Sequence, residues 1–179
     1  ERLGRPLAPR VLAESPDDHF FVMSFLPPDA RPNWKAELMA GRIDPAFAAT
    51  VGRDLAFIHA KTAYAAAVAR EFDHGAMFRA LRIEPYLLHT ATRHGDLSAR
   101  LTALAGETLE TAIALVHGDV SPKNILVGPE GPVFLDAECA WFGDPAFDLA
   151  FCLAHLVLKA VWRPELRAAY LAAFEALAE

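Results

Sequence analysis

The chain has 179 residues, of which 54% are hydrophobic, and its formal net charge at pH 7 is -6. This length is enough for one domain with a sizeable core, and the apolar content excludes a disordered segment. The acidic charge argues against a nucleic-acid-binding protein, because phosphates require a basic surface.

Cysteine usage and hydropathy predict a cytoplasmic protein without a membrane partner. Cys139 and Cys152 lie outside any CxxC or metal-ligand spacing, so we expect two reduced, buried thiols. The first residues lack the apolar run of a signal peptide. The longest apolar stretch, residues 149–161, contains His155 and Lys159 and is too short to span a bilayer.

The first predicted element is a strand at residues 19–26. It is rich in aromatic and β-branched residues and is bounded by two aspartates and two prolines. Residues 10–13 are its expected partner. The segment 31–35 then connects to the helices, either beside a substrate pocket or as a plain loop with Trp34 packed on the core.

Helical patterns dominate the middle of the chain. Asp44 is the expected N-cap of a helix that begins at Pro45 and reaches His59, because apolar residues recur there at helical spacing. Three further helical patterns cover residues 77–81, 85–92 and 97–116.

The helical pattern ends at His117. Residues 125–127 and 133–135 are short β-like runs around a Gly- and Pro-rich turn, which predicts a hairpin. Asp144-Pro145 begins another capped helix through Lys159, and Pro164 begins the last helix. This order of elements predicts an α+β fold dominated by helix.

Three ordered sequence blocks carry the chemical information. His117-Gly118-Asp119 and Asn124 keep the spacing of the kinase catalytic loop, H-R-D-x-x-x-x-N, with glycine in the arginine position. The block Asp136-Ala137-Glu138 follows the hairpin. The third block joins Gly143-Asp144-Pro145 to Asp148-Leu149-Ala150. Together they resemble the HGD-x-x-x-x-N, D-x-E and GDPxxDLA signatures of the aminoglycoside phosphotransferase and choline kinase-like family.

The resemblance implies a protein-kinase-like fold in which most of the N-terminal lobe is absent. Residues 1–26 would be the remnant of the nucleotide-binding lobe with its hinge strand, and residues 27–179 the helical catalytic lobe. By position, main-chain groups of Ser24, Phe25 and Leu26 would hold the adenine, although this segment also fits an ordinary core strand. The family's glycine-rich phosphate loop and strand lysine do not occur in these residues.

The residue types suit phosphoryl transfer. Asp119 is the candidate base for a substrate hydroxyl, and Asn124 and Asp136 offer the oxygen ligands that Mg²⁺ takes beside the phosphates of ATP or GTP. We expect these three side chains to meet around one magnesium-nucleotide site. By resemblance, His117 orients the catalytic loop and a buried Asp148 holds its backbone.

Each residue taken alone also has a structural interpretation. Asp and Asn are common turn formers, and Asp148 suits the first turn of a helix for its charge alone. Ser121, Lys123 and Glu138 flank the site and are possible contributors, but a solvated lysine or glutamate needs no function. His59 and His155 are expected to be packed, hydrogen-bonded histidines rather than ligands.

The predicted function is ATP-dependent phosphorylation of a small-molecule hydroxyl, with this chain alone inactive and prone to self-association. The alternatives are a non-catalytic kinase-fold binding module and a helical scaffold with an accidental motif. The acidic residues of the region expected to line the acceptor site are scattered, so the sequence does not indicate an aminoglycoside acceptor. They are Glu84, Asp96, Glu107 and Glu110.

Overall fold

The computed structural model describes residues 5–179, which form two compact units. The first unit takes in the chain up to Gly52, together with Val120–Asp136 and Cys152–Glu179. The second unit comprises Arg53–Asp119 and Ala137–Phe151. This division differs from the predicted boundary at residue 26, which stays a prediction.

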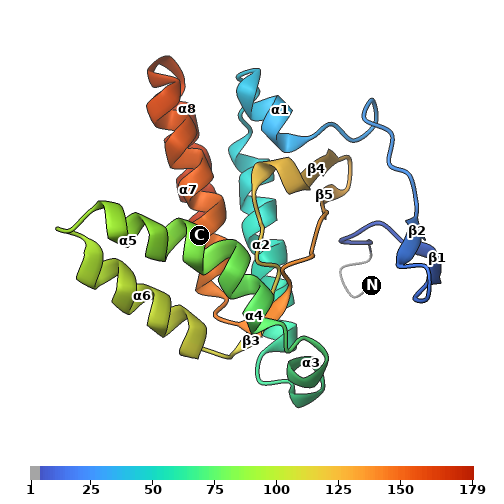
Figure 1. Ribbon diagram of the computed structural model, residues 1–179. Coiled ribbons are helices and arrows are strands. Elements are labelled where there is room, and N and C mark those ends of the chain that lie inside the picture. Colours follow the sequence, from blue (N-terminus) through green and yellow to red (C-terminus); the bar gives the residue numbers. More distant parts are fainter. Residues whose placement is uncertain (1–4) are drawn as a thin grey trace. The chain divides into compact units, whose positions relative to one another are not determined.

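The first unit begins with an antiparallel hairpin of β1 (Val11–Ser15) and β2 (Phe20–Met23) (Figure 1). This confirms the predicted strand and its partner, although β2 ends before Ser24. Both strands expose apolar side chains: Phe21, for example, is 62% exposed. The hairpin therefore does not contribute to the core of the unit.

The core of the first unit lies among its helices. They are α1 (Trp34–Met39), the start of α2 (Pro45–Thr62), the second part of α7 (Ala146–Trp162), and α8 (Arg167–Ala178) after the 3₁₀ turn η3 (Pro164–Leu166). Asp44 caps α2 as predicted, since its carboxylate accepts a hydrogen bond from Ala46 N at 2.9 Å. Gly52 lets α2 approach α8, because a Cβ there would lie 2.2 Å from the Leu177 carbonyl oxygen.

A second hairpin in the same unit confirms another prediction. A 3₁₀ turn, η2 (Pro122–Asn124), leads into β4 (Ile125–Gly128), which pairs with β5 (Gly131–Phe134). The hairpin is anchored to the segment before α1, because Val127 N donates to Pro32 O at 2.8 Å.

The second unit holds most of the middle helices, the first part of α7 and a two-stranded sheet. Its elements are α3 (Ala66–Glu71), α4 (Gly75–Phe78), the π-helix η1 (Arg79–Leu88), α5 (His89–Arg93), α6 (Ser98–Glu110), β3 (Ala114–Val116) and β6 (Trp141–Gly143). Strands β3 and β6 pair antiparallel. Helices α5 and α6 pack side by side (Figure 1).

Two predicted helices need correction. The pattern at 97–116 predicted helix to its end, but α6 stops at Glu110 and residues 114–116 form a strand. The reason is burial, since Ala114 and Val116 are completely buried in β3 where it pairs with β6. Pro85 does not begin a helix either: it lies inside η1, whose buried residues are Arg82 and Ile83.

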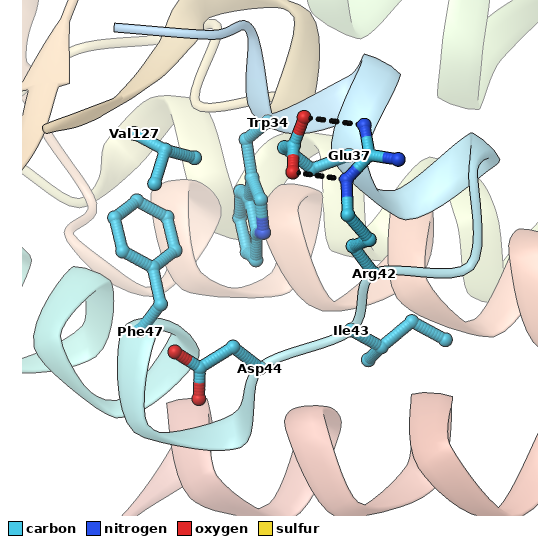
Figure 2. A pocket seen from close by; sticks show the side chains of 7 residues that line it. All are labelled: Trp34, Glu37, Arg42, Ile43, Asp44, Phe47 and Val127. Atoms are coloured by element: carbon cyan, nitrogen blue, oxygen red, sulfur yellow. Dashed lines mark hydrogen bonds and ion pairs between the residues drawn. The ribbon is translucent and has the colours of Figure 1, made fainter. Parts of the chain in front are cut away.

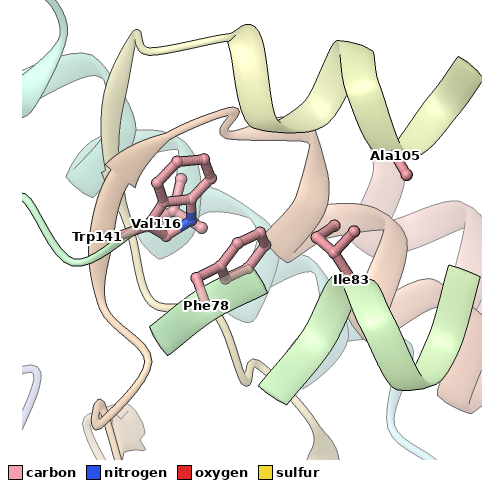
Figure 3. Close-up of a cluster of buried hydrophobic side chains, with 5 residues drawn as sticks. All are labelled: Phe78, Ile83, Ala105, Val116 and Trp141. Atoms are coloured by element: carbon pink, nitrogen blue, oxygen red, sulfur yellow. The ribbon is translucent and has the colours of Figure 1, made fainter. Parts of the chain in front are cut away.

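Figure 3 shows the core of the second unit. Phe78 stacks on Trp141 with ring centroids 4.5 Å apart, and Phe147 meets Phe78 edge to face at 4.7 Å. Ile83, Ala105 and Val116 complete the cluster. Because these residues come from α4, η1, α6, β3 and β6, the cluster holds η1 against the strand that leads into residue 117.

The remaining predictions concern α7 and the cysteines. Asp144 caps α7 through a 2.9 Å hydrogen bond from Ala146 N, and the helix passes Lys159 to end at Trp162, as expected. Cys139 and Cys152 are free and buried, also as expected. Within residues 5–179, every helix is too short or too polar to cross a bilayer.

Candidate active site

Asp119 is a buried carboxylate with a cationic partner. It lies three residues after the end of β3, is 3% exposed, and its Oδ2 lies 3.0 Å from the Nη2 of Arg82. Arg82 is itself buried on η1, and its Nε donates to the Gly118 carbonyl at 2.7 Å. One guanidinium thus contacts both the side chain of Asp119 and the backbone just before it.

Gly118 has a conformation and a packing that only glycine tolerates. Its φ is +78°, in the left-handed region that L-residues with a side chain avoid. A Cβ at this position would lie 2.6 Å from the carbonyl oxygen of Cys139. The glycine that replaces arginine in the kinase loop pattern is therefore required by the fold of this unit.

Asp148 holds the backbone of the same loop. It is 1% exposed, and its two carboxylate oxygens accept hydrogen bonds from His117 N at 2.8 Å and Gly118 N at 2.9 Å. Oδ2 also lies 3.1 Å from Nε2 of His59. A buried carboxylate that accepts hydrogen bonds from several N–H groups fixes the positions of these groups, because a buried N–H without a partner is costly.

His117 contacts the loop through its own ring. Its Nδ1 accepts a hydrogen bond from Asp119 N at 3.2 Å. His59 is the packed, hydrogen-bonded histidine that the sequence predicted, since it contacts Asp148. Neither ring needs to act as a ligand to explain its position.

Asn124 and Asp136 lie at neighbouring ends of the β4–β5 hairpin in the first unit. Asn124 O accepts a hydrogen bond from Leu135 N at 2.8 Å, which joins the end of η2 to the residue before Asp136. Asn124 is 6% exposed. The side chain of Asp136 is 47% exposed, and its Oδ2 lies 4.0 Å from Nζ of Lys123. The structure therefore brings together the two predicted metal ligands.

The backbone of Asp136 is unusual. Its φ is +63°, which few residues other than glycine adopt, although aspartate does so more readily than most. Such conformations are strained, and they persist where the surrounding structure enforces them, often at functional sites. The segment after β5 thus has an uncommon backbone conformation at the residue that carries this carboxylate.

The donor chemistry of this pair fits Mg²⁺. Among residues 5–179, no three His, Cys, Asp or Glu side chains gather as a metal-binding group. Mg²⁺ does not need such a group, since it is usually held by one or two protein oxygen ligands together with phosphate oxygens and water. An amide oxygen and a carboxylate are suitable for a magnesium-nucleotide complex.

The other predicted site residues have varied surroundings. Ser121 is 1% exposed, and within the described residues its Oγ has no hydrogen-bond partner, which is uncommon for a buried hydroxyl. Lys123 and Glu138 are exposed. The segment of Ser24, Phe25 and Leu26 follows β2 without regular structure, and Ser24 is tied to Arg10 by two hydrogen bonds of 2.9 and 3.0 Å.

A cavity of about 310 Å³ lies in the first unit (Figure 2). Trp34 is 2% exposed and packs edge to face on Phe47 with ring centroids 5.4 Å apart, as expected for a residue packed on the core. That residues 31–35 border a substrate pocket stays a prediction. The charged groups at this cavity already have partners, because Glu37 pairs with Arg42 and Asp44 caps α2. The full lining is Trp34, Glu37, Arg42, Ile43, Asp44, Phe47 and Val127.

The predicted site residues are divided between the two units. His117, Asp119 and Asp148 belong to the second, whereas Asn124 and Asp136 belong to the first. Sequence reasoning missed Arg82. One signal was available, because Arg82 follows the apolar Phe78 at the i, i+4 spacing that shares a helix face, and that face is buried.

Known proteins resemble this chain in sequence and in fold. A model of the phosphotransferase enzyme family, APH, matches residues 2–179. Methylthioribose kinases 1 and 2 of Oryza sativa subsp. japonica are 32% and 30% identical over 63 residues, which are 35% of this chain and 15% of each of those proteins.

A solved structure shares the fold. It is a choline/ethanolamine kinase family protein from Mesorhizobium loti, with a TM-score of 0.55 and 23% sequence identity. The match covers 92% of this chain and 55% of that one, so the chain spans about half the length of its structural relative.

Proposed function

Because the chain belongs to the phosphotransferase enzyme family, we propose that it supplies the catalytic part of a kinase for small molecules. The reaction is transfer of the γ-phosphoryl group of ATP, or GTP, to a hydroxyl group of the acceptor. The observation that carries this proposal is the loop before Asp119, whose backbone N–H groups at 117 and 118 are both held by Asp148.

Asp119 is the proposed general base. A carboxylate at a fixed position can accept the proton of the acceptor hydroxyl as its oxygen attacks the γ-phosphorus. The nucleotide leaves with the β-phosphate oxygen, and the proton stays on Asp119 until solvent removes it. Positioning dominates the catalysis of such transfers, which explains a buried, hydrogen-bonded loop around the base.

Asn124 and Asp136 are the proposed magnesium ligands. The ion neutralises phosphate charge when it is bound with the nucleotide. The protein's own part is to present the amide oxygen and the carboxylate from the two ends of one hairpin. By family resemblance, main-chain groups of residues 24–26 would hold the adenine.

We infer that the complete reaction requires parts of a kinase that these 179 residues do not contain. The structural relative matches along only 55% of its own length, and no glycine-rich phosphate loop occurs in the 179 residues. The isolated chain is therefore expected to be inactive, and any longer gene product that contains it is expected to be active. Normal turnover by the isolated chain would contradict this part of the proposal.

The test is a nucleotide-consumption screen of the full-length gene product. The names of the relatives suggest choline, ethanolamine and methylthioribose as the first acceptors, followed by other amino alcohols, sugars and aminoglycosides. With an active acceptor, Asp119→Ala is expected to lower kcat by about 10²–10⁴-fold, the usual contribution of a general base.

Matched variants separate the base from its surroundings. Asp17→Ala, at an exposed aspartate in the turn between β1 and β2, is the control and should leave kcat within about twofold. Asp136→Asn should raise the magnesium concentration needed for half-maximal rate. If Asp119→Ala keeps full activity, the base lies elsewhere. If the protein binds nucleotide but no acceptor supports turnover, that result favours a non-catalytic binding module.

A further inference from the structure

Arg82 occupies a position that the proposed mechanism does not yet use. Its guanidinium is buried, with its side chain 10% exposed, beside the 4% exposed side chain of Asp119. Three of its nitrogens have different partners: Nη2 the Asp119 carboxylate at 3.0 Å, Nε the Gly118 carbonyl at 2.7 Å, and Nη1 the Leu81 carbonyl at 2.9 Å. All of these contacts lie inside the second unit.

We propose that Arg82 is a positioning residue for the base: it fixes the orientation of the Asp119 carboxylate relative to the loop backbone. This inference rests on the proposed function, in which Asp119 accepts the acceptor's proton. The planar guanidinium presents its donors at fixed angles, so binding Oδ2 and the carbonyl of the preceding residue together leaves the carboxylate little freedom to rotate.

The support for Arg82 comes from the core rather than from the loop. Its neighbour Ile83 is completely buried, and the Phe78–Trp141 stack lies at the start of the same π-helix. π-Helical hydrogen bonding is rare in proteins, and where it does occur, mostly as single turns, it is often found at functional sites. Burying an arginine is costly unless its charge is paired and its donors have partners, so a partner at each of the three nitrogens indicates a specific placement.

A positioning role predicts a split between kcat and KM. Arg82→Gln in the full-length gene product should lower kcat by about 30–100-fold, because Asp119 then samples unproductive orientations. The KM for nucleotide should change by less than about threefold, since Arg82 does not contact it in this proposal. Arg82→Lys keeps the charge but loses the planar geometry, and should recover part of the lost kcat.

The control is on the same helix. Arg79 forms an exposed ion pair with Glu84 at 3.2 Å, so Arg79→Gln should leave kcat within about twofold. Thermal unfolding of every variant shows whether it is folded. If Arg82→Gln does not fold, Arg82→Lys decides, because wild-type kcat in that variant would show that the geometry of the guanidinium is not needed.

Double substitution separates this inference from the proposal on which it rests. If Asp119 is the base and Arg82 acts through it, Arg82→Gln should have little further effect on kcat in Asp119→Asn protein. Wild-type kcat in Arg82→Gln, with activity lost in Asp119→Asn, overturns the role of Arg82 alone. Full activity in Asp119→Asn overturns the assignment of the base, and the role of Arg82 with it.

Discussion

At the scale of single residues, the loop that carries Asp119 depends on contacts made by groups distant in sequence. Asp148 binds two of its N–H groups, and Arg82 binds one of its carbonyls. Gly118 provides the tight turn between them, against the backbone of Cys139. The loop is therefore held through its main chain as well as through its side chains.

Gly118→Ala should lower the free energy of unfolding by about 2 kcal/mol or more. The left-handed conformation costs about 1–2 kcal/mol for a residue with a Cβ, and the close contact with Cys139 O adds to this cost. Urea denaturation measures the change.

Gly106→Ala is the matched control for this substitution. Gly106 lies within α6, where a Cβ would have no atom within 4 Å. The control should gain about 0.5–1 kcal/mol of stability from the better helix former. Equal stability changes in the two variants would show that position 118 tolerates a side chain.

The sequence predicts which side chains form the candidate site, but it does not predict which distant residues hold them in place. The spacing of the loop motifs predicts Asp119, Asn124 and Asp136 as site residues, and their roles stay predictions. Arg82 has no fixed spacing to Asp119, since it reaches the loop through the packing of η1 on the core. Spacing along a chain does not show which distant helix faces a given loop.

At the scale of elements, α7 carries a buried lysine among mostly apolar residues. Lys159 is 8% exposed, and burial lowers its pKa below the ordinary value, with the positive charge of Lys35 acting in the same direction. Between the lowered pKa and the ordinary one, the unfolded chain holds more protons than the folded chain. Stability therefore rises with pH across that window.

Lys159→Met should remove this alkaline rise and increase stability at neutral pH, because a charged group no longer has to be buried. Urea unfolding at about pH 7 to 11, around the ordinary lysine pKa, measures both effects. Burial raises the pKa of Tyr170, which makes stability fall with pH in nearly the same range. This effect is present both in the wild-type protein and in Lys159→Met, so it cancels when their stabilities are subtracted. Lys61→Met, at an exposed lysine, is the control.

The elements that could be predicted are those with local signals. Neighbouring residues in the sequence predict the helix starts capped by Asp44 and Asp144. They also predict the turn between β4 and β5. Strands β3 and β6 pair across a long stretch of chain and have three residues each, so neither shows a usable period. The π-helix has no local signature, because burial of its apolar face rather than propensity selects it.

At the scale of the whole molecule, the β1–β2 hairpin exposes a large apolar surface. Single exposed apolar side chains are common, but a contiguous group on a two-stranded hairpin favours association. The side chains at least 45% exposed are Val11, Leu12, Phe20, Phe21, Val22, Met23 and, just beyond β2, Phe25.

The 179-residue chain is expected to self-associate through this hairpin. Sedimentation velocity at increasing protein concentration should show a rising mean sedimentation coefficient. Phe21→Lys should reduce the rise, because the substituted strand carries a repelling charge. Leu104→Lys, at a 46% exposed position on α6, should not. A monodisperse monomer over the whole concentration range would disprove the expectation.

The lack of space for a side chain at position 118 also determines from which part of the chain a positive charge can reach Asp119. In H-R-D loops an arginine is the immediate neighbour of that residue, but here the carbonyl of Cys139 leaves no room for one. The guanidinium near Asp119 comes instead from Arg82 in the π-helix at residues 79–88. Each turn of a π-helix contains more residues than a turn of an α-helix. We expect a one-residue deletion in that helix to move Arg82 away from Asp119 without changing the sequence of the loop. Homologues that keep the loop motif can therefore differ in this charge, and a search by motif alone would not detect the difference.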